Sequence, residues 1–460
     1  MRTFAHYQQQ KKGMKYFIWI IITGSILLLK PWKFGLAGEF FYTPKNTTFI
    51  SSVDSSDSIY LLPANQVITN KDSELELTRK FDRIIEKFMH RWEIKGASFA
   101  LMKNNHLIYS KGYGFADLEA NIPMDVMHVF RIASVSKLIT AVGIMKLQEE
   151  GKLRLDDYVF GSRGILNDSI FLHIKDKRSY KITVENLLRH QGGYSIAYGD
   201  PMFCPVAIAE KMNVPPPADL NTMIRFVLSR RLSYSPGKST AYSNIGYGIL
   251  SKVIEKISGE NYETYIRKHV LLPAGCFDMH LGKNLYENKL PNEVKYYEVS
   301  NAELIPACDG SGQMVPRSNG GNNIEELYGA GGWVASPSEL LRFLAAIDNH
   351  PEIPDILNPV SIEYMTRHIP HTLPIGWIET NSKGDWIRTG TLAGTSALMK
   401  KQADGYSWVF LTNTSSWKGS RFHYYIDTAI DRAMATVTEW PQRNLFEMQN
   451  TDYEKLLVIQ

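Results

Sequence analysis

The feature that most constrains this 460-residue chain is an apolar helical run with a serine and a lysine at its head, Ser134 and Lys137. Apolar residues recur through the run at the spacing of one helical face, at Val135, Leu138, Ile139, Val142 and Met145. Gly151 follows the run and supplies a helix-ending signal. Because a helix places positions i and i+3 on one face, the pattern predicts a core helix that presents Ser134 and Lys137 side by side.

This position suits nucleophilic chemistry. In the first turn of a helix, unpaired backbone N–H groups and the helix dipole favour negative charge developing on Ser134. Lys137 lies one turn deeper among apolar residues, where desolvation disfavours the ammonium form and makes the amine a usable base. A serine that attacks a carbonyl needs such a proton acceptor. Ser134 and Lys137 are therefore a candidate nucleophile and base.

A second motif places a tyrosine and an amide two residues apart. Tyr242 and Asn244 lie in a loop that contains Pro236 and Gly237 and enters an apolar helix predicted over 247–258. Two such side chains on one loop can face the same cavity. The hydroxyl would move protons there and the amide would hold a carbonyl.

A third motif follows near the end of the chain. Arg388, Thr389 and Gly390 end a short strand-like run and precede Thr391. A cation beside a glycine that permits close backbone approach suits an anionic or carbonyl-bearing substrate laid along an edge strand.

The first two motifs each have a second copy in the chain. Ser415 and Lys418 repeat the serine–lysine spacing, and Tyr286 with Asn288 repeats the second motif. Ser415 lies in a polar, Gly-flanked stretch, whereas only Ser134 opens an apolar helix and precedes both partner motifs. Context therefore favours Ser134 as the nucleophile.

With these motifs in this order, the chain resembles the serine β-lactamase and penicillin-binding-protein superfamily. It is most similar to the class C-like branch, which contains class C β-lactamases, D-alanyl-D-alanine carboxypeptidases and family VIII esterases. Stretches beginning at Gly96, Ile182, Leu271 and Gly329 fit the same pattern. The resemblance runs from about residue 77 to about residue 437.

The resemblance implies a role for each motif residue. Ser134 resembles the acylated nucleophile and Lys137 the amine that takes its proton. Tyr242 resembles the hydroxyl that relays protons to the leaving group and later activates water. Asn244 resembles the amide that holds Lys137 or the substrate. The backbone N–H groups of Ser134 and Thr391 would form the oxyanion hole.

The third motif departs from the pattern, because Arg388 stands where relatives mostly carry Lys or His. The charge is kept but proton exchange is lost, so we expect Arg388 to bind a substrate carboxylate. With Thr389, Gly390 and Thr391 it forms the candidate substrate-binding strand.

The expected function is that of an exported serine hydrolase. It would act through an acyl-enzyme on an ester, a D-amino-acid peptide or a β-lactam, without a cofactor or metal. The substrate would be a small molecule or derive from the cell wall. The alternative is a sensor-like protein that keeps the fold and binds cell-wall peptides or β-lactams without turnover; the presence of both Lys137 and Tyr242 favours catalysis.

The remaining periodicity predicts an α+β fold. Strand-like runs at 97–101 and 107–113 turn at Asn104 and Asn105, and a second hairpin joins 395–400 to 407–411. Helical patterns cover 77–92 and 424–435. We expect one antiparallel sheet built from both chain ends and flanked by helices, with an inserted, mostly helical region. The active site would lie between the sheet and that region.

The N-terminal residues predict export. A basic segment precedes the apolar run 16–29, as in a signal peptide or signal anchor, so residues 1–37 are a leader that is either cleaved or retained as a membrane tether. Removing its six Lys and Arg residues from the total of 51 leaves 45 basic against 47 acidic side chains. No basic face for nucleic acid is implied.

The predicted organisation has four parts. After the leader come a polar linker over 38–74, the hydrolase domain over 75–437 and a C-terminal extension over 438–460. Cys204, Cys276 and Cys308 are widely spaced, so at most one disulfide is expected and no zinc site is indicated. Nothing in the sequence fixes the oligomeric state.

Overall fold

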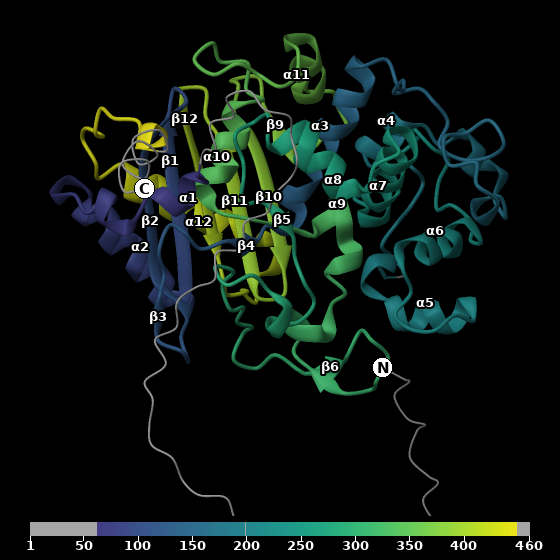
Figure 1. Ribbon diagram of the computed structural model, residues 1–460, viewed down its shortest axis with the longest axis horizontal. Helices are drawn as coiled ribbons and strands as arrows, with labels where there is room; N and C mark the ends of the chain where they lie inside the picture. The colour runs from purple at the N-terminus through teal and green to yellow at the C-terminus, as the bar shows by residue number, and fades with distance from the viewer. Residues whose placement is uncertain (1–61, 198, 449–460) are drawn as a thin grey trace, which may run out of the picture. The chain divides into compact units, whose positions relative to one another are not determined.

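The computed structural model describes residues 62–197 and 199–448. The predicted leader, the linker up to residue 61 and the last part of the C-terminal extension lie outside them. The helices of the described part (Figure 1) are α1 Ala64–Val67, α2 Arg79–Arg91, α3 Ser136–Glu149, α4 Val184–Leu188, α5 Pro205–Met212, α6 Leu220–Leu228, α7 Asn244–Ser258, α8 Tyr262–Ile266, α9 Tyr328–Gly331, α10 Pro337–Ala345, α11 Pro359–Thr366 and α12 His423–Met434. The strands are β1 Gly96–Lys103, β2 His106–Asp117, β3 Ile122–Pro123, β4 Phe130–Arg131, β5 His280–Leu281, β6 Ile305–Pro306, β7 Met314–Val315, β8 Trp333–Ala335, β9 Glu379–Thr380, β10 Trp386–Leu392, β11 Thr395–Lys401 and β12 Tyr406–Thr412.

The main sheet joins the two ends of the domain. Its strands follow the order β3-β2-β1-β12-β11-β10-β9, and neighbouring strands are antiparallel. β1 pairs with β12 from Ala97 opposite Thr412 to Lys103 opposite Tyr406. The predicted α+β architecture, with strands from both chain ends in one sheet, is confirmed.

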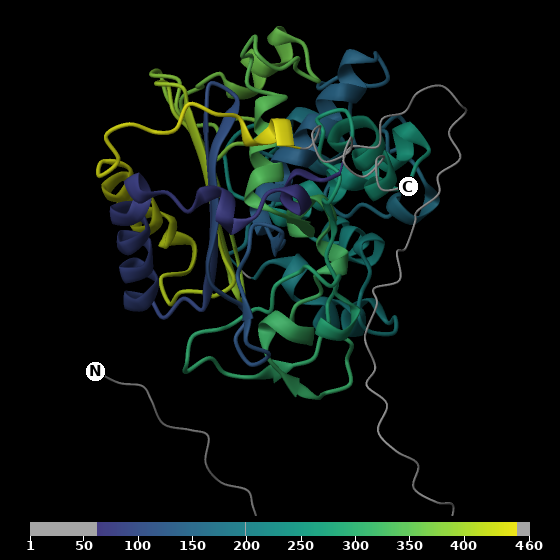
Figure 2. The same cartoon turned by 60° about the vertical axis from the view of Figure 1, so that its left-hand side comes forward.

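The central strands are covered on both faces. Phe99 and Leu101 of β1 pack into the core beneath α2 and α12, whereas Ala100 and Met102 pack into the larger core on the opposite face. Figure 2 shows α2 and α12 side by side as the outer layer of the sheet. Alternate residues of β1 therefore serve two cores, which explains why the strand reads as an almost continuous apolar run.

The helical region occupies the other side of the sheet (Figure 1) and contains α3. Side chains are buried on every side of α3, from Ser136 to Leu147, as expected for a helix inside a large core. Gly151 follows with φ of +68° and ends the helix in the predicted way. The predicted core helix is therefore present, and it is more completely enclosed than one apolar face requires.

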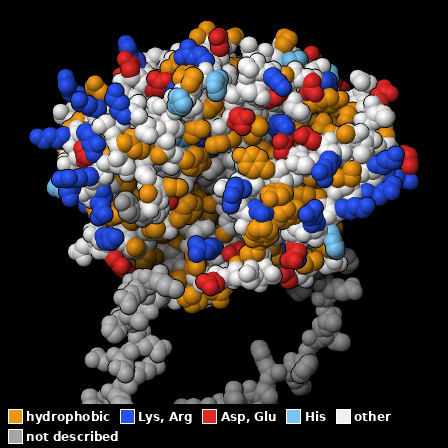
Figure 3. All heavy atoms as spheres, turned by 180° about the vertical axis from the view of Figure 1, so that it is seen from behind, with side chains coloured by type: hydrophobic (Ala, Val, Ile, Leu, Met, Phe, Trp, Pro, Cys, Tyr) orange, Lys and Arg blue, Asp and Glu red, His pale blue; other side chains and the backbone are white. Residues whose placement is uncertain are grey.

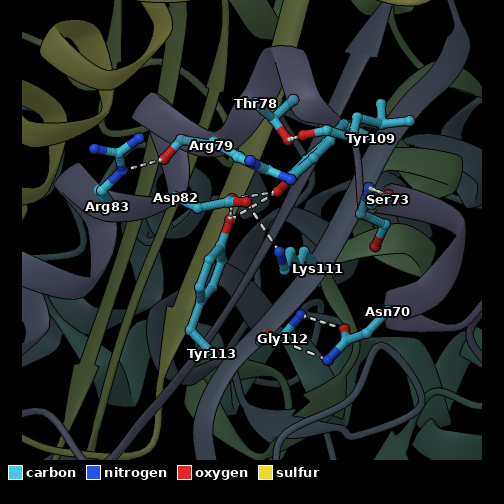
Figure 4. A network of polar contacts seen from close by, with 12 residues as sticks. Asn70, Ser73, Thr78, Arg79, Asp82, Arg83, Tyr109, Lys111, Gly112 and Tyr113 are labelled. Atoms are coloured by element: carbon cyan, nitrogen blue, oxygen red, sulfur yellow. Dashed lines mark hydrogen bonds and ion pairs between the residues drawn. The ribbon is translucent and has the colours of Figure 1, made fainter.

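A buried polar network fixes α2 to the sheet (Figure 4). Asp82 of α2 accepts hydrogen bonds from the hydroxyls of Tyr109 (2.6 Å) and Tyr113 (2.8 Å) and from Lys111 Nζ (2.9 Å). Burial, together with the Asp82 charge, raises the pKa of Tyr109 above its usual value. Both hydroxyls therefore stay protonated and act as donors to one carboxylate.

Parts of the predicted linker and extension pack on the domain. Asn65 in α1 is buried and donates to Asp278 at 2.8 Å, and Ile68 is also buried. At the other end, Trp440 and Phe446 are buried in the two cores. The packed domain thus includes residues on both sides of the predicted limits, 75 and 437, because scattered apolar side chains in these polar segments reach the core.

The surface seen in Figure 3 mixes acidic, basic and hydrophobic side chains. No helix within residues 62–197 and 199–448 is long and apolar enough to cross a bilayer. The apolar run 16–29, on which the expected tether depends, lies outside this part.

We expect Asp82→Ala to lower the free energy of unfolding by about 2–4 kcal/mol, because two buried hydroxyls and a lysine lose their shared acceptor. Urea denaturation followed by tryptophan fluorescence measures this change. The control is Asp156→Ala, which removes a solvent-exposed ion pair with Arg154 and should leave the urea midpoint in place. Equal midpoints for the two variants would show that the Asp82 network contributes nothing.

Candidate active site

Ser134 lies in a 3₁₀ turn, Ala133–Val135, which leads directly into α3. Ala133 has φ of +48°, in the left-handed region that a non-glycine residue rarely adopts. Strand β10 presses against this turn, since a Cβ on Gly390 would lie 2.2 Å from Ile132 O. The turn is therefore held in a strained conformation by close packing against a glycine, as is common at functional sites.

Lys137 lies directly behind Ser134 and is fully buried. Its Nζ is 3.1 Å from Ser134 Oγ and 2.7 Å from Asn244 Oδ1, and it also contacts the carbonyl oxygen of Ala330 in α9. Burial is the largest cause that lowers the pKa of this amine, and the Arg388 charge lowers it further. The predicted nucleophile–base pair is thus assembled, with the amine biased toward its neutral form.

Tyr242 completes a cluster of ionisable groups around Lys137. The Lys137 amine lies 5.0 Å from the centre of the Tyr242 ring. Burial would raise the pKa of the Tyr242 hydroxyl, but the charges of Lys137 and Arg388 and hydrogen bonds from Lys137 and Ser134 outweigh it and lower the pKa to about 8. A tyrosine with this pKa can take and return a proton near neutral pH.

Asn244 is the first residue of α7 and bridges two charged groups. Its Oδ1 accepts from Lys137, while its Nδ2 donates to Asp200 Oδ2 at 2.6 Å. The sequence left open whether Asn244 holds Lys137 or the substrate. In the structure its amide holds Lys137.

Arg388 points into the protein from β10. Its Nε and Nη2 both donate to Ser134 O, at 2.8 and 2.5 Å, and Nη2 also donates to Tyr242 Oη at 3.4 Å. The side chain is only 1% exposed. This differs from the expectation that Arg388 offers its fork to a substrate carboxylate, because two of its nitrogens are engaged by the backbone of the nucleophile.

The rest of the third motif lies along an open stretch of β10. Thr389 and Thr391 are half-buried, whereas Gly390 faces the Ser134 turn. β9 pairs with β10 only at Trp386 and Ile387. Within the described residues, the outer edge of β10 beyond Ile387 therefore has no strand beside it, and an extended substrate could pair there.

The second copies of the motifs do not form sites of this kind. Lys418 extends its amine over the Trp417 ring, 3.8 Å from the ring centre, instead of toward Ser415. Tyr286 lies in a short 3₁₀ turn and its hydroxyl donates to Tyr296 O. The structure thus brings Ser134, Lys137 and Tyr242 together, whereas Lys418 packs on Trp417.

Three residues near the site were not identified from sequence. His190 stacks on Tyr242 with 4.5 Å between ring centres, and its Nδ1 accepts from the backbone N–H of Ser243. Burial is the main cause that lowers the pKa of His190 well below its usual value, so the ring is neutral. The other two of these three residues are Asp200 and Ala330, whose carbonyl oxygen contacts Lys137. His190 and Ala330 each lie in a stretch that fits the family pattern, whereas no such signal marks Asp200.

No group of three or more His, Cys, Asp or Glu side chains gathers as metal ligands in the described residues. Cys204, Cys276 and Cys308 are free thiols.

Comparison with known proteins places this geometry in a family. A sequence model of the beta-lactamase family matches residues 81–431. Among curated relatives, Protein flp of Staphylococcus aureus (strain MW2) is 30% identical over 203 residues. That match spans 42% of this chain and 36% of the relative, so the chain covers well under half of the relative's length.

Solved structures agree on the fold. D-amino acid amidase from Ochrobactrum anthropi SV3 aligns with a TM-score of 0.61 at 19% identity, over 79% of this chain and 99% of the amidase. EstCE1, a hydrolase with promiscuous acyltransferase activity, aligns with a TM-score of 0.57 at 20% identity, over 80% of this chain and 99% of its own. The family model matches about three quarters of the chain and agrees with the fold, so the chain belongs to the beta-lactamase family.

Proposed function

We propose that this protein hydrolyses ester or D-amino-acid amide and peptide bonds through an acyl-enzyme on Ser134. The observation that carries the proposal is the buried Lys137 amine, 3.1 Å from Ser134 Oγ and beside Tyr242. Solved proteins of similar fold support esters and D-amino-acid amides as substrates, since they include a D-amino acid amidase and a hydrolase with promiscuous acyltransferase activity. Export through the basic and apolar N-terminal segment is part of the same proposal.

In acylation, Lys137, Ser134 and Tyr242 act one after another. The neutral Lys137 amine takes the proton from Ser134 Oγ, which bonds to the substrate carbonyl carbon. The carbonyl oxygen becomes an oxyanion that the N–H groups of Ser134 and Thr391 receive. The Tyr242 hydroxyl gives a proton to the leaving oxygen or nitrogen as its bond to carbon breaks. The proton on Lys137 passes back to Tyr242. Water then gives a proton to the cluster and attacks the acyl carbon, and the bond from that carbon to Ser134 Oγ breaks as Oγ takes a proton back.

Arg388 supports these steps without exchanging a proton. A guanidinium stays charged over the working pH range, and two of its nitrogens fix the Ser134 carbonyl. Its charge also lowers the pKa of both Lys137 and Tyr242. Recognition of a substrate carboxylate then falls to the open part of β10, at Thr389 and Thr391.

Deacylation separates the substrate classes. An ester or peptide loses its leaving group, which opens one side of the acyl-enzyme to water. A β-lactam keeps its ring fragment there, so release needs a water positioned by Tyr242 and its neighbours. We therefore place esters and D-amino-acid peptides ahead of β-lactams as substrates.

Intact-protein mass spectrometry over time, with a short-chain ester, a D-amino-acid amide and a β-lactam, tests the proposal. We expect short-lived acyl adducts with the first two and a longer-lived adduct with the β-lactam. Ser134→Ala should abolish every adduct, whereas Ser415→Ala should label like the parent. Adducts that survive in Ser134→Ala would overturn the assignment. A β-lactam adduct without ester or amide turnover would instead favour a sensor-like binding protein.

Gly390→Ala should reduce kcat for a p-nitrophenyl ester by about 10²–10³-fold, because β10 must move away from Ile132 and carry the Thr391 N–H out of the oxyanion hole. The matched control is Gly246→Ala in α7, where an added methyl would meet nothing nearer than 3.7 Å. Comparable kcat values for the two variants would show that the close approach at Gly390 is dispensable.

Removing the charge of Arg388 should change the pH dependence of kcat/KM. Lys137 must be neutral to take the Ser134 proton, so kcat/KM rises with pH as the amine loses its proton. Arg388→Gln removes a charge that lowers the pKa of both groups, and the rising limb should move to higher pH by about one unit or more. Arg388→Lys keeps the charge and should keep the limb near its original place. A limb that stays fixed in Arg388→Gln would contradict this account of the cluster.

A further inference from the structure

The Asn244 amide joins two groups that the fold brings in from different segments. On one side its Oδ1 accepts from Lys137 Nζ at 2.7 Å, and on the other its Nδ2 donates to Asp200 Oδ2 at 2.6 Å. Asp200 comes from a loop 44 residues before Asn244. Neither the motifs nor the mechanism above assigns Asp200 a role.

We propose that Asp200 is a positioning residue that fixes the orientation of the Asn244 amide and thereby aims the free electron pair of Lys137 at Ser134 Oγ. The proposal rests on the function proposed above, in which the neutral Lys137 amine takes the Ser134 proton. It adds a residue that acts through another and touches no substrate.

The number of hydrogens on Lys137 limits what each of its neighbours can do. A neutral amine has two N–H donors and one electron pair. Around Nζ lie Asn244 Oδ1, the Ala330 carbonyl and Ser134 Oγ, and the Tyr242 hydroxyl is also a hydrogen-bond partner of the amine. The first two are carbonyl oxygens that can only accept, so they take the two N–H groups. The electron pair is left for the hydroxyl side of the site, where Ser134 Oγ lies 3.1 Å from Nζ beside the Tyr242 hydroxyl.

This arrangement requires that Asn244 turn its oxygen toward Lys137. An amide is nearly symmetric in shape, so packing alone does not choose between its two orientations. An ionised carboxylate only accepts hydrogen bonds, and Asp200 therefore selects the orientation with Nδ2 toward itself. In the reverse orientation, Nδ2 would face Lys137 and compete with Ser134 for the electron pair.

Asp200 is itself held in place. It caps the short 3₁₀ helix Pro201–Phe203, where its Oδ1 accepts from the backbone N–H of Met202 at 3.0 Å. Burial raises the pKa of this carboxyl above its usual value. When Asp200 takes up a proton at low pH it becomes a donor as well, and its control over the amide is lost. The other charged or titratable groups that act on Lys137 or are acted on by it are Tyr242, Arg388 and His190.

The first test measures the rate at which a fluorophosphonate labels Ser134, which requires no knowledge of the natural substrate. Asp200→Ala frees the amide to rotate, and we expect the second-order labelling rate to fall at least tenfold at every pH. The matched control is Asp219→Ala, which likewise removes a carboxylate cap, on Thr222 N in α6. It should label like the parent. Thermal melting of both variants confirms that each is folded.

A swap of partners then separates orientation from mere structural support. Asn244→Asp alone sets two carboxylates against each other and should label slowly. Adding Asp200→Asn restores a donor at position 200 opposite a carboxylate at position 244, which again turns oxygen toward Lys137. We expect the double variant to label at least fivefold faster than Asn244→Asp. The labelling rate of the double variant should rise at a higher pH than that of the parent, because a carboxylate beside Lys137 raises the pKa of the amine.

The outcomes distinguish the two proposals. If the parent protein is not labelled, or is labelled equally in Ser134→Ala, the proposed function itself fails. If the parent is labelled at Ser134 but Asp200→Ala keeps the parent rate, the role of Asp200 is overturned. A double variant that labels no faster than Asn244→Asp, with both folded, also overturns it.

Discussion

The burial of the Lys137 amine is the constraint on which the site depends. A charged ammonium without water is costly unless every hydrogen finds an acceptor, so the surrounding segments must either supply acceptors or let the amine lose its proton. The fold does both: α9 supplies a carbonyl and α7 an amide oxygen, while burial lowers the pKa of the amine. The enclosure of α3 in the core is thus also what favours the neutral, basic form of Lys137.

Long-range pairing brings the partners of this lysine to it. The three motifs lie more than a hundred residues apart in sequence, yet Arg388 of β10 contacts the backbone of Ser134 and Asn244 of α7 contacts Lys137. β10 reaches this position because the sheet joins both chain ends and because Gly390 lets the strand approach Ile132 O. Ala133, with φ of +48°, lies in the turn that this strand approaches.

Much of the fold could be predicted from sequence, because hydrophobic periodicity and turn residues report on local structure. The Asn104–Asn105 turn, with φ of 48° and 63°, and the end of α3 at Gly151 are of this kind. The choice of Ser134 over Ser415 also followed from local context, and Lys418 does lie over Trp417 instead of facing Ser415. Contacts between distant segments could not be predicted in this way. Asp200 had no motif around it, and the partner of Arg388 was expected to be a substrate, since nothing local shows that a strand cation will turn toward a backbone carbonyl.

The arginine in the third motif changes how the site divides its work. Arg388 makes two hydrogen bonds to Ser134 O through different nitrogens and still reaches the Tyr242 hydroxyl, a geometry that a planar guanidinium allows and a single ammonium does not. A guanidinium cannot release a proton at working pH, so in the proposed mechanism proton transfer falls to Lys137 and Tyr242. Both groups lie between fixed neighbours. Arg388 provides a permanent positive charge, and the Asn244 amide is held by its hydrogen bond to Asp200. The site thus has a fixed charge beside Lys137 where a lysine or histidine would add a third group able to exchange a proton.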